Sequence, residues 1–256
     1  MTEGKSPIDW MTVAAIGVLA MCVVTFDHEA LGHGSACLLL HGHIRLLTSS
    51  LFRCDVRSGW IDPAGPGMNL LIGTIALVAQ RLIPSERTKL RLFLIALTAF
   101  SFFWEGGYLI RAMHRRDGDV YYFAQFMLGD VTLAERWAFA IAGLALFVFC
   151  ARRTSRALLD LCPRASAARS LARILWISAT AGAAAAALAY RESGWGNLRD
   201  AVLEIGLASF PLLILPIRGQ TTGGVPPVIR RNPITIGLAV LVYCAFVATL
   251  GRGLGV

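Results

Sequence analysis

Long apolar runs separated by short polar gaps dominate the sequence. The first run, from Trp10 to about His41, would be about 48 Å long as a helix, compared with about 30 Å for the hydrocarbon core of a bilayer. Further runs cover residues 69–83, 89–113, 133–150, 171–190, 198–217 and 234–250. Because 56% of the residues are hydrophobic and only 16% are charged, the chain has too few polar groups to coat a soluble globule of its size. We therefore expect an all-α, polytopic membrane protein with about seven transmembrane helices.

The segment between the first two runs, residues 42–66, has a different character. It contains short β-prone pieces, HIRLL and SLFRC, among charged residues. This pattern predicts a short hairpin or a re-entrant segment after the first helix. Since the first run is longer than a bilayer is thick, its helix is expected to tilt, to bend or to consist of two pieces.

The basic residues lie in the gaps between the apolar runs. The formal net charge is +8, but the arginines do not form a basic face with interleaved aromatic residues, so no nucleic acid partner is expected. With seven spans, 14 basic residues fall on the side of the N-terminus and 10 on the other side. The positive-inside rule therefore predicts a cytoplasmic N-terminus. The first residues carry acids and no small-residue cleavage site, so no removable signal peptide is expected.

Ionisable residues interrupt the first apolar run at residues 26–34, which read FDHEALGHG. Charged groups at membrane depth are costly and mark functional sites. His28, Glu29 and His33 resemble the HExxH signature, in which two histidines bind Zn²⁺ and the glutamate is the general base. Here the spacing is HExxxH, with one more residue before the second histidine. The pattern predicts a zinc site with His28 and His33 as ligands and Glu29 as the catalytic base.

The extra residue changes which side chains face each other. On a regular α-helix, residues five apart point about 140° away from one another, so His28 and His33 would not share a metal ion. A one-residue π-bulge restores the facing, and Gly32 makes such a distortion less costly. On an undistorted helix only Glu29 and His33 share a face. Without a metal, the two histidines would be interfacial and Glu29 would snorkel or cap the helix.

Three polar residues further along the chain are candidates for the same site. Glu105 lies within an apolar run, and Asp119 lies just beyond its end. We expect one of them to be the third metal ligand, with Glu105 ahead of Asp119 because an acid inside an apolar run needs a partner. Asn69, at the start of another apolar run, is a candidate for binding the substrate backbone, or equally for a helix cap or an interhelical hydrogen bond.

The order of three motifs resembles the site-2 protease family of intramembrane zinc metalloproteases. After the histidine motif, residues 63–69 read PAGPGMN and residues 104–110 read WEGGYLI, similar to the AGPxxN and LDGG motifs of that family. The matching positions are Ala64, Gly65, Pro66, Asn69, Gly106 and Gly107, together with His28, Glu29 and His33. Glu105 stands where the family has an aspartate ligand.

The resemblance covers residues 10–125. It implies a metalloprotease-like core of three spans in residues 1–125, with accessory transmembrane helices of unknown role in residues 126–256. It also implies hydrolysis of peptide bonds in transmembrane or membrane-proximal segments, with Zn²⁺ as cofactor and a membrane protein or peptide as partner. The alternative is a non-catalytic membrane protein, such as a pseudoprotease, a transporter or a metal-handling protein. Neither the substrate sequence nor the oligomeric state follows from the sequence.

The six cysteines form no CxxC motif. With seven spans, Cys54 and Cys162 lie on opposite sides of the membrane and cannot pair. The other four lie within apolar runs and are expected to be small core residues: Cys22, Cys37, Cys150 and Cys244.

Overall fold

A computed structural model describes residues 8–190, 192, 194–215, 217 and 229–255. The chain is mostly helical, with one small sheet. The first helical stretch joins α1 (Trp10–Phe26), the π-helix η1 (Asp27–Gly34) and α2 (Ser35–Leu39), and the strands β1 (Ile44–Leu47) and β2 (Phe52–Cys54) follow. The remaining elements are α3 (Ala64–Leu82), α4 (Thr88–Arg115), α5 (Asp119–Leu128), α6 (Leu133–Leu161), α7 (Ala165–Ala187), α8 (Gly194–Ala201), η2 (Val202–Leu207), α9 (Pro211–Ile214), α10 (Pro233–Phe246) and η3 (Val247–Gly251).

Five helical stretches among the described residues are long and apolar enough to cross a membrane: Trp10–Leu39, Thr88–Arg115, Leu133–Leu161, Ala165–Ala187 and Pro233–Gly251. The mostly helical structure is compatible with the predicted all-α membrane protein, with five candidate spans among the described residues where the sequence suggested about seven. The run at 69–83 lies in α3, whose apolar character is diluted by Asn69 and Gln80. The run at 198–217 is divided among α8, η2 and α9.

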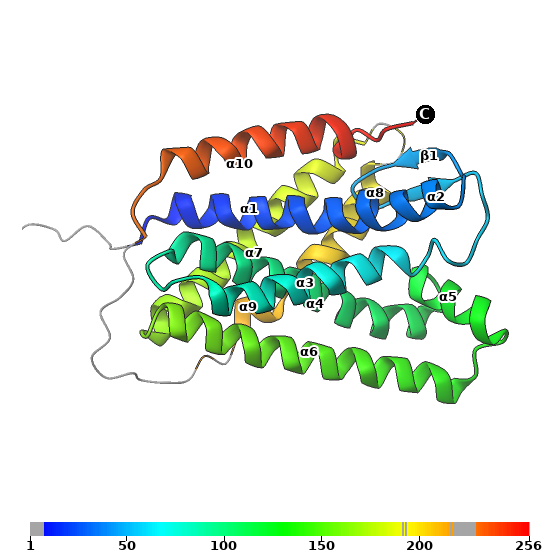
Figure 1. The fold of residues 1–256 in the computed structure, drawn as a ribbon, viewed down its shortest axis with the longest axis horizontal. Coiled ribbons are helices and arrows are strands. Elements are labelled where there is room, and N and C mark those ends of the chain that lie inside the picture. Colours follow the sequence, from blue (N-terminus) through cyan, green and yellow to red (C-terminus); the bar gives the residue numbers. More distant parts are fainter. Residues whose placement is uncertain (1–7, 191, 193, 216, 218–228, 256) are drawn as a thin grey trace, which may run out of the picture.

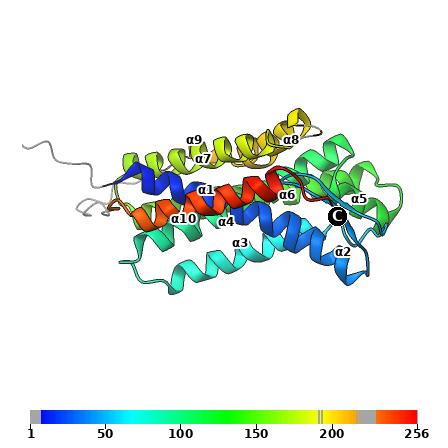
Figure 2. The same cartoon turned by 90° about the horizontal axis from the view of Figure 1, so that it is seen from above.

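The helices lie side by side along the long axis of the molecule (Figure 1). The helix α1 packs against α4, α7 and α10, and α4 also packs against α3 and α6. Seen from above, α7 to α9 form one face and α3 lies on the opposite face (Figure 2). The strands, α2, α5 and the C-terminus gather at one end of the molecule, which we call the hairpin end (Figure 1).

The β-hairpin expected after the first helix is confirmed. The strands β1 and β2 pair antiparallel, with Leu47 opposite Phe52. The outer edge of β1 is covered by the C-terminal segment, because Leu47 and Leu254 exchange two backbone hydrogen bonds of 2.9 Å. The C-terminal segment thus extends the small sheet on the β1 side.

A disulfide bond between Cys37 and Cys54 joins α2 to β2. The assignment of Cys37 as a small core residue was therefore wrong. The chain reverses after α2, where His41 adopts a positive φ of 58°, and the hairpin folds back until the two Cα atoms are 6.0 Å apart. Gly42 permits this approach, since a Cβ there would lie 2.6 Å from the Cys54 sulfur. Cys162 is a free, buried thiol.

Candidate metal centre

The two histidines of the first motif face the same point. The stretch Asp27–Gly34 is a π-helix, in which residues five apart lie on one side. His28 Nε2 and His33 Nε2 are 3.3 Å apart, and both side chains are buried. The predicted π distortion is confirmed, and the undistorted helix that would pair Glu29 with His33 is not formed.

Gly32 has a role beyond easing the helix distortion. A Cβ at residue 32 would lie 2.5 Å from the Gly65 Cα and 2.7 Å from the Ala64 carbonyl oxygen. The glycine therefore lets the first turn of α3 approach η1 directly. Gly65 is in turn close to the histidines, since a Cβ there would lie 2.4 Å from His33 Nε2 and 2.7 Å from His28 Nε2.

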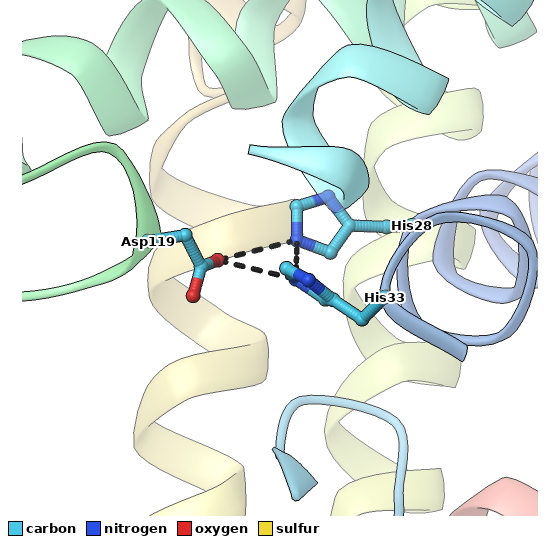
Figure 3. A group of neighbouring side chains, drawn as sticks. All are labelled: His28, His33 and Asp119. Carbon is cyan, nitrogen blue, oxygen red and sulfur yellow. Dashed lines mark hydrogen bonds and ion pairs between the residues drawn. The ribbon is translucent and has the colours of Figure 1, made fainter. Parts of the chain in front are cut away.

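Asp119 completes the cluster from the first turn of α5. Its Oδ2 atom lies 3.3 Å from His33 Nε2 and 3.6 Å from His28 Nε2. Figure 3 shows the three side chains pointing toward one another. Ligands placed tetrahedrally at zinc distances of about 2.0–2.2 Å lie about 3.3–3.6 Å from each other. The three donor atoms therefore have the spacing of a tetrahedral site with one position left for another ligand.

Both imidazoles have a partner for the nitrogen that faces away from the centre. His33 Nδ1 lies 2.8 Å from the Ile61 carbonyl oxygen, to which it donates when protonated. His28 Nδ1 lies 3.3 Å from Glu105 Oε1, and the Asn69 amide donates to the same oxygen at 2.8 Å. The carbonyl acceptor fixes the tautomer of His33 and directs its Nε2 lone pair at a metal ion. His28 Nδ1 also lies 3.0 Å from the Asn69 amide nitrogen, and its Nε2 lone pair is free for a metal ion when Nδ1 donates to Glu105. The cluster thus has the outer partners expected of a metal site.

The structure reverses the expected order of Glu105 and Asp119 as candidates for the third metal ligand. Glu105 approaches the Nδ1 atom of His28, not the point at which the Nε2 atoms converge. After α4 the chain turns back through Arg116 and Gly118, which have positive φ angles of 57° and 91°. This reversal brings Asp119 to the histidines. Asn69, fully buried, contacts Glu105 and His28 rather than lining a cavity.

Tyr108 holds Asp119 in place, a contact that the sequence analysis missed. The backbone N–H of Asp119 donates to the Tyr108 hydroxyl at 2.8 Å, and this hydroxyl donates to Asp119 Oδ2 at 3.0 Å. Gly118 leaves room for the ring, since a Cβ there would lie 2.5 Å from the hydroxyl oxygen. Tyr108 lies one helical turn after Glu105, and this spacing was the sequence signal that could have placed Tyr108 near the centre.

A polar cavity of about 420 Å³ adjoins the cluster. Glu29 lines it together with the three donor residues. Other lining residues come from the hairpin, from the segment around Asp62 and from α8 and η2 in the C-terminal half. Glu204 of η2 is paired with Arg111 at 3.4 Å. Residues 126–256 therefore contribute directly to the cavity.

Two carboxyl groups at the hairpin end have shifted pKa values. Burial by itself would raise the pKa of Asp119, but hydrogen bonds from His28 and His33 outweigh it and hold this pKa well below the usual range. Burial raises the pKa of Asp62 to about 6, and the nearby charge of Asp119 acts in the same direction. Asp119 is thus held as a carboxylate, the form that binds a metal ion.

Comparisons with protein-family models, with curated proteins and with solved structures give no match for this chain. The resemblance to site-2 proteases therefore stays a hypothesis.

Proposed function

We propose that the protein is a membrane-embedded zinc peptidase that cleaves transmembrane or membrane-proximal segments. One observation carries the proposal: two histidine nitrogens and a carboxylate oxygen converge at tetrahedral spacing, beside a cavity that Glu29 also lines. Three protein ligands and an open position are typical of catalytic rather than structural zinc. When bound, zinc would act as a Lewis acid toward water and the peptide carbonyl.

The residues around the centre divide into three roles. His28, His33 and Asp119 hold the ion. Glu29 takes a proton from the attacking water and gives one to the leaving amine, as a general base and then a general acid. Glu105 and Asn69 orient His28, and Tyr108 orients Asp119. In this assignment Glu105 is a positioning residue, and the ligand that the family resemblance places at its position is supplied by Asp119.

The hairpin offers a way to hold an extended substrate. Phe52 of β2 lines the cavity, and its ring stacks on His33 with 5.6 Å between centroids. The outer edge of β1 is already paired with Leu254. Within the described part of the chain, no segment outside the hairpin forms a backbone hydrogen bond with β2. We infer that an unwound substrate segment adds to β2, which places its peptide bonds next to the centre.

We further infer that the N-terminus is cytoplasmic and that the hairpin end faces the opposite side. The excess of basic residues on the N-terminal side supports this orientation. The Cys37–Cys54 disulfide lies at the hairpin end. It gives independent support, because disulfides persist in oxidising compartments. Substrates would therefore be cleaved near the non-cytoplasmic surface of the membrane.

Metal analysis combined with a cleavage assay tests the proposal. The protein purified in mild detergent should contain about one zinc per chain, and His33→Ala should contain none. The zinc-loaded protein, in vesicles with a panel of single-span membrane proteins, should cleave at least one of them, and His33→Ala should cleave none. The same zinc content in both proteins would refute the site. Zinc binding without any cleavage would favour a non-catalytic metal-binding membrane protein.

A further inference from the structure

A second cavity, of about 440 Å³, lies between α4, α6 and η2. We call it the side groove. Its lining is mainly apolar and includes Ile110 of α4, Phe147 of α6 and Leu207 of η2. Gly107 forms part of the lining, and a Cβ there would lie 3.1 Å from the Cβ of Ala208. A larger side chain at either position would therefore take up space in the side groove.

The side groove adjoins the cavity of the metal centre. Both cavities are lined by five of the same residues, which are Tyr108, Arg111, Arg115, Leu203 and Glu204. The Arg111–Glu204 ion pair thus lies where the two cavities meet. A molecule bound at the centre could extend into the side groove at this point.

Trp104 links the side groove to a metal-binding residue. It lines the side groove, and its indole stacks on His28 with 4.5 Å between ring centroids and 11° between planes. The buried indole N–H has no hydrogen-bond partner among the described residues. The side groove therefore reaches to within one aromatic ring of the centre.

The side groove also faces the surroundings of the helices. The helices α4 and α6 both belong to candidate membrane spans. Leu207, at the rim on η2, is 61% exposed. An apolar groove with an exposed apolar rim is accessible to a group that arrives from the hydrocarbon core of the bilayer.

On the basis of the proposed function, we propose that the side groove binds a large apolar side chain of the substrate next to the cleaved bond. The occupant is a leucine-like or aromatic residue of a membrane-derived segment. The residues that it shares with the metal cavity distinguish the side groove from a lipid-filled surface depression. The peptidase would then select substrates by this side chain, since an apolar pocket discriminates between large and small residues through the area that each one buries.

Hydroxamate probes test this proposal without a known substrate, because the hydroxamate group binds zinc and the attached residue reports on the neighbouring pocket. The zinc-loaded full chain in lipid nanodiscs would be titrated with acetohydroxamate and with two peptide hydroxamates that differ only in carrying glycine or leucine. The leucine probe should bind at least about tenfold more tightly than the glycine probe. Acetohydroxamate measures access to the metal alone.

Two variants and a matched control locate the preference in the side groove. Ala208→Leu should reduce the preference for leucine to about one and leave the affinity for acetohydroxamate unchanged. Leu207→Ala, at an exposed and therefore tolerant position, should reduce the preference by severalfold. Ala145→Leu introduces the same side chain at an exposed position of α6 that does not line the side groove, and should preserve the preference.

The outcomes separate this inference from the proposed function. Equal affinities of the two peptide probes for a parent protein that binds zinc and acetohydroxamate would refute the side groove as a subsite and leave the peptidase intact. An unchanged preference in both Ala208→Leu and Leu207→Ala would refute it as well. A parent protein that binds no zinc would refute the proposed function, and the subsite with it.

Discussion

Substituting Gly65 by alanine should remove the metal while leaving the fold in place. Gly65 is in the first turn of α3, and the position of its missing Cβ is 2.4 Å from His33 Nε2 and 2.7 Å from His28 Nε2. Either the added methyl group occupies space that the ion needs, or the imidazoles must move away. Both outcomes disturb the two nitrogens that hold the ion.

The size of the effect follows from these distances. A carbon atom in ordinary contact lies about 3.5 Å from its neighbour, so the imidazole nitrogens would have to move by about 0.8–1.1 Å. Metal–ligand distances tolerate about 0.2 Å. Since loss of an outer partner alone costs up to about 100-fold in metal affinity, Gly65→Ala should cost at least about 100-fold, or ~2.8 kcal/mol.

The matched control is Gly67→Ala on the same helix. A Cβ at residue 67 has no neighbouring atom within 4 Å, so this variant should bind zinc like the parent. Zinc affinity would be measured by competition with a chromophoric chelator, and the fold by circular dichroism of the metal-free proteins. Parent-like zinc affinity in Gly65→Ala would show that the ion does not lie between the two histidines.

Four other substitutions probe the remaining roles. Glu29→Gln should retain zinc but lower cleavage by about 10²–10⁴-fold, the usual cost of losing a general base, and a joint loss of zinc would make Glu29 a ligand instead. Asp119→Ala should abolish measurable zinc binding, whereas Glu105→Ala should weaken it by about 10–100-fold, as expected of an outer partner, and the opposite order in a chelator competition would restore Glu105 as the ligand. Tyr108→Phe removes the hydroxyl that holds Asp119 and should weaken zinc binding by about tenfold and alter the visible spectrum of the cobalt-substituted protein, while an unchanged spectrum would remove its positioning role.

The sequence by itself determined the local features of this protein. The apolar runs require helices in a membrane, because only internal hydrogen bonds satisfy the backbone there. The five-residue spacing of His28 and His33 in such a run predicts a π-helix, since a regular helix would point them apart. The β-prone pieces after the first helix predict the hairpin. Each of these features depends on residues close together in the chain, and the structure contains all of them.

The tertiary structure alone decided which distant residues meet. Asp119 reaches the histidines because the chain reverses between α4 and α5, and no periodicity in the sequence encodes the direction of that return. Likewise, Cys37 meets Cys54 only because the hairpin folds back on α2, and Glu204 meets Arg111 only through helix packing. Hydrophobic periodicity specifies which face of a helix is buried, but packing against other helices selects the partner of that face. For this reason the sequence located two donors of the candidate centre and offered Glu105 and Asp119 as the third, and only the fold selected Asp119.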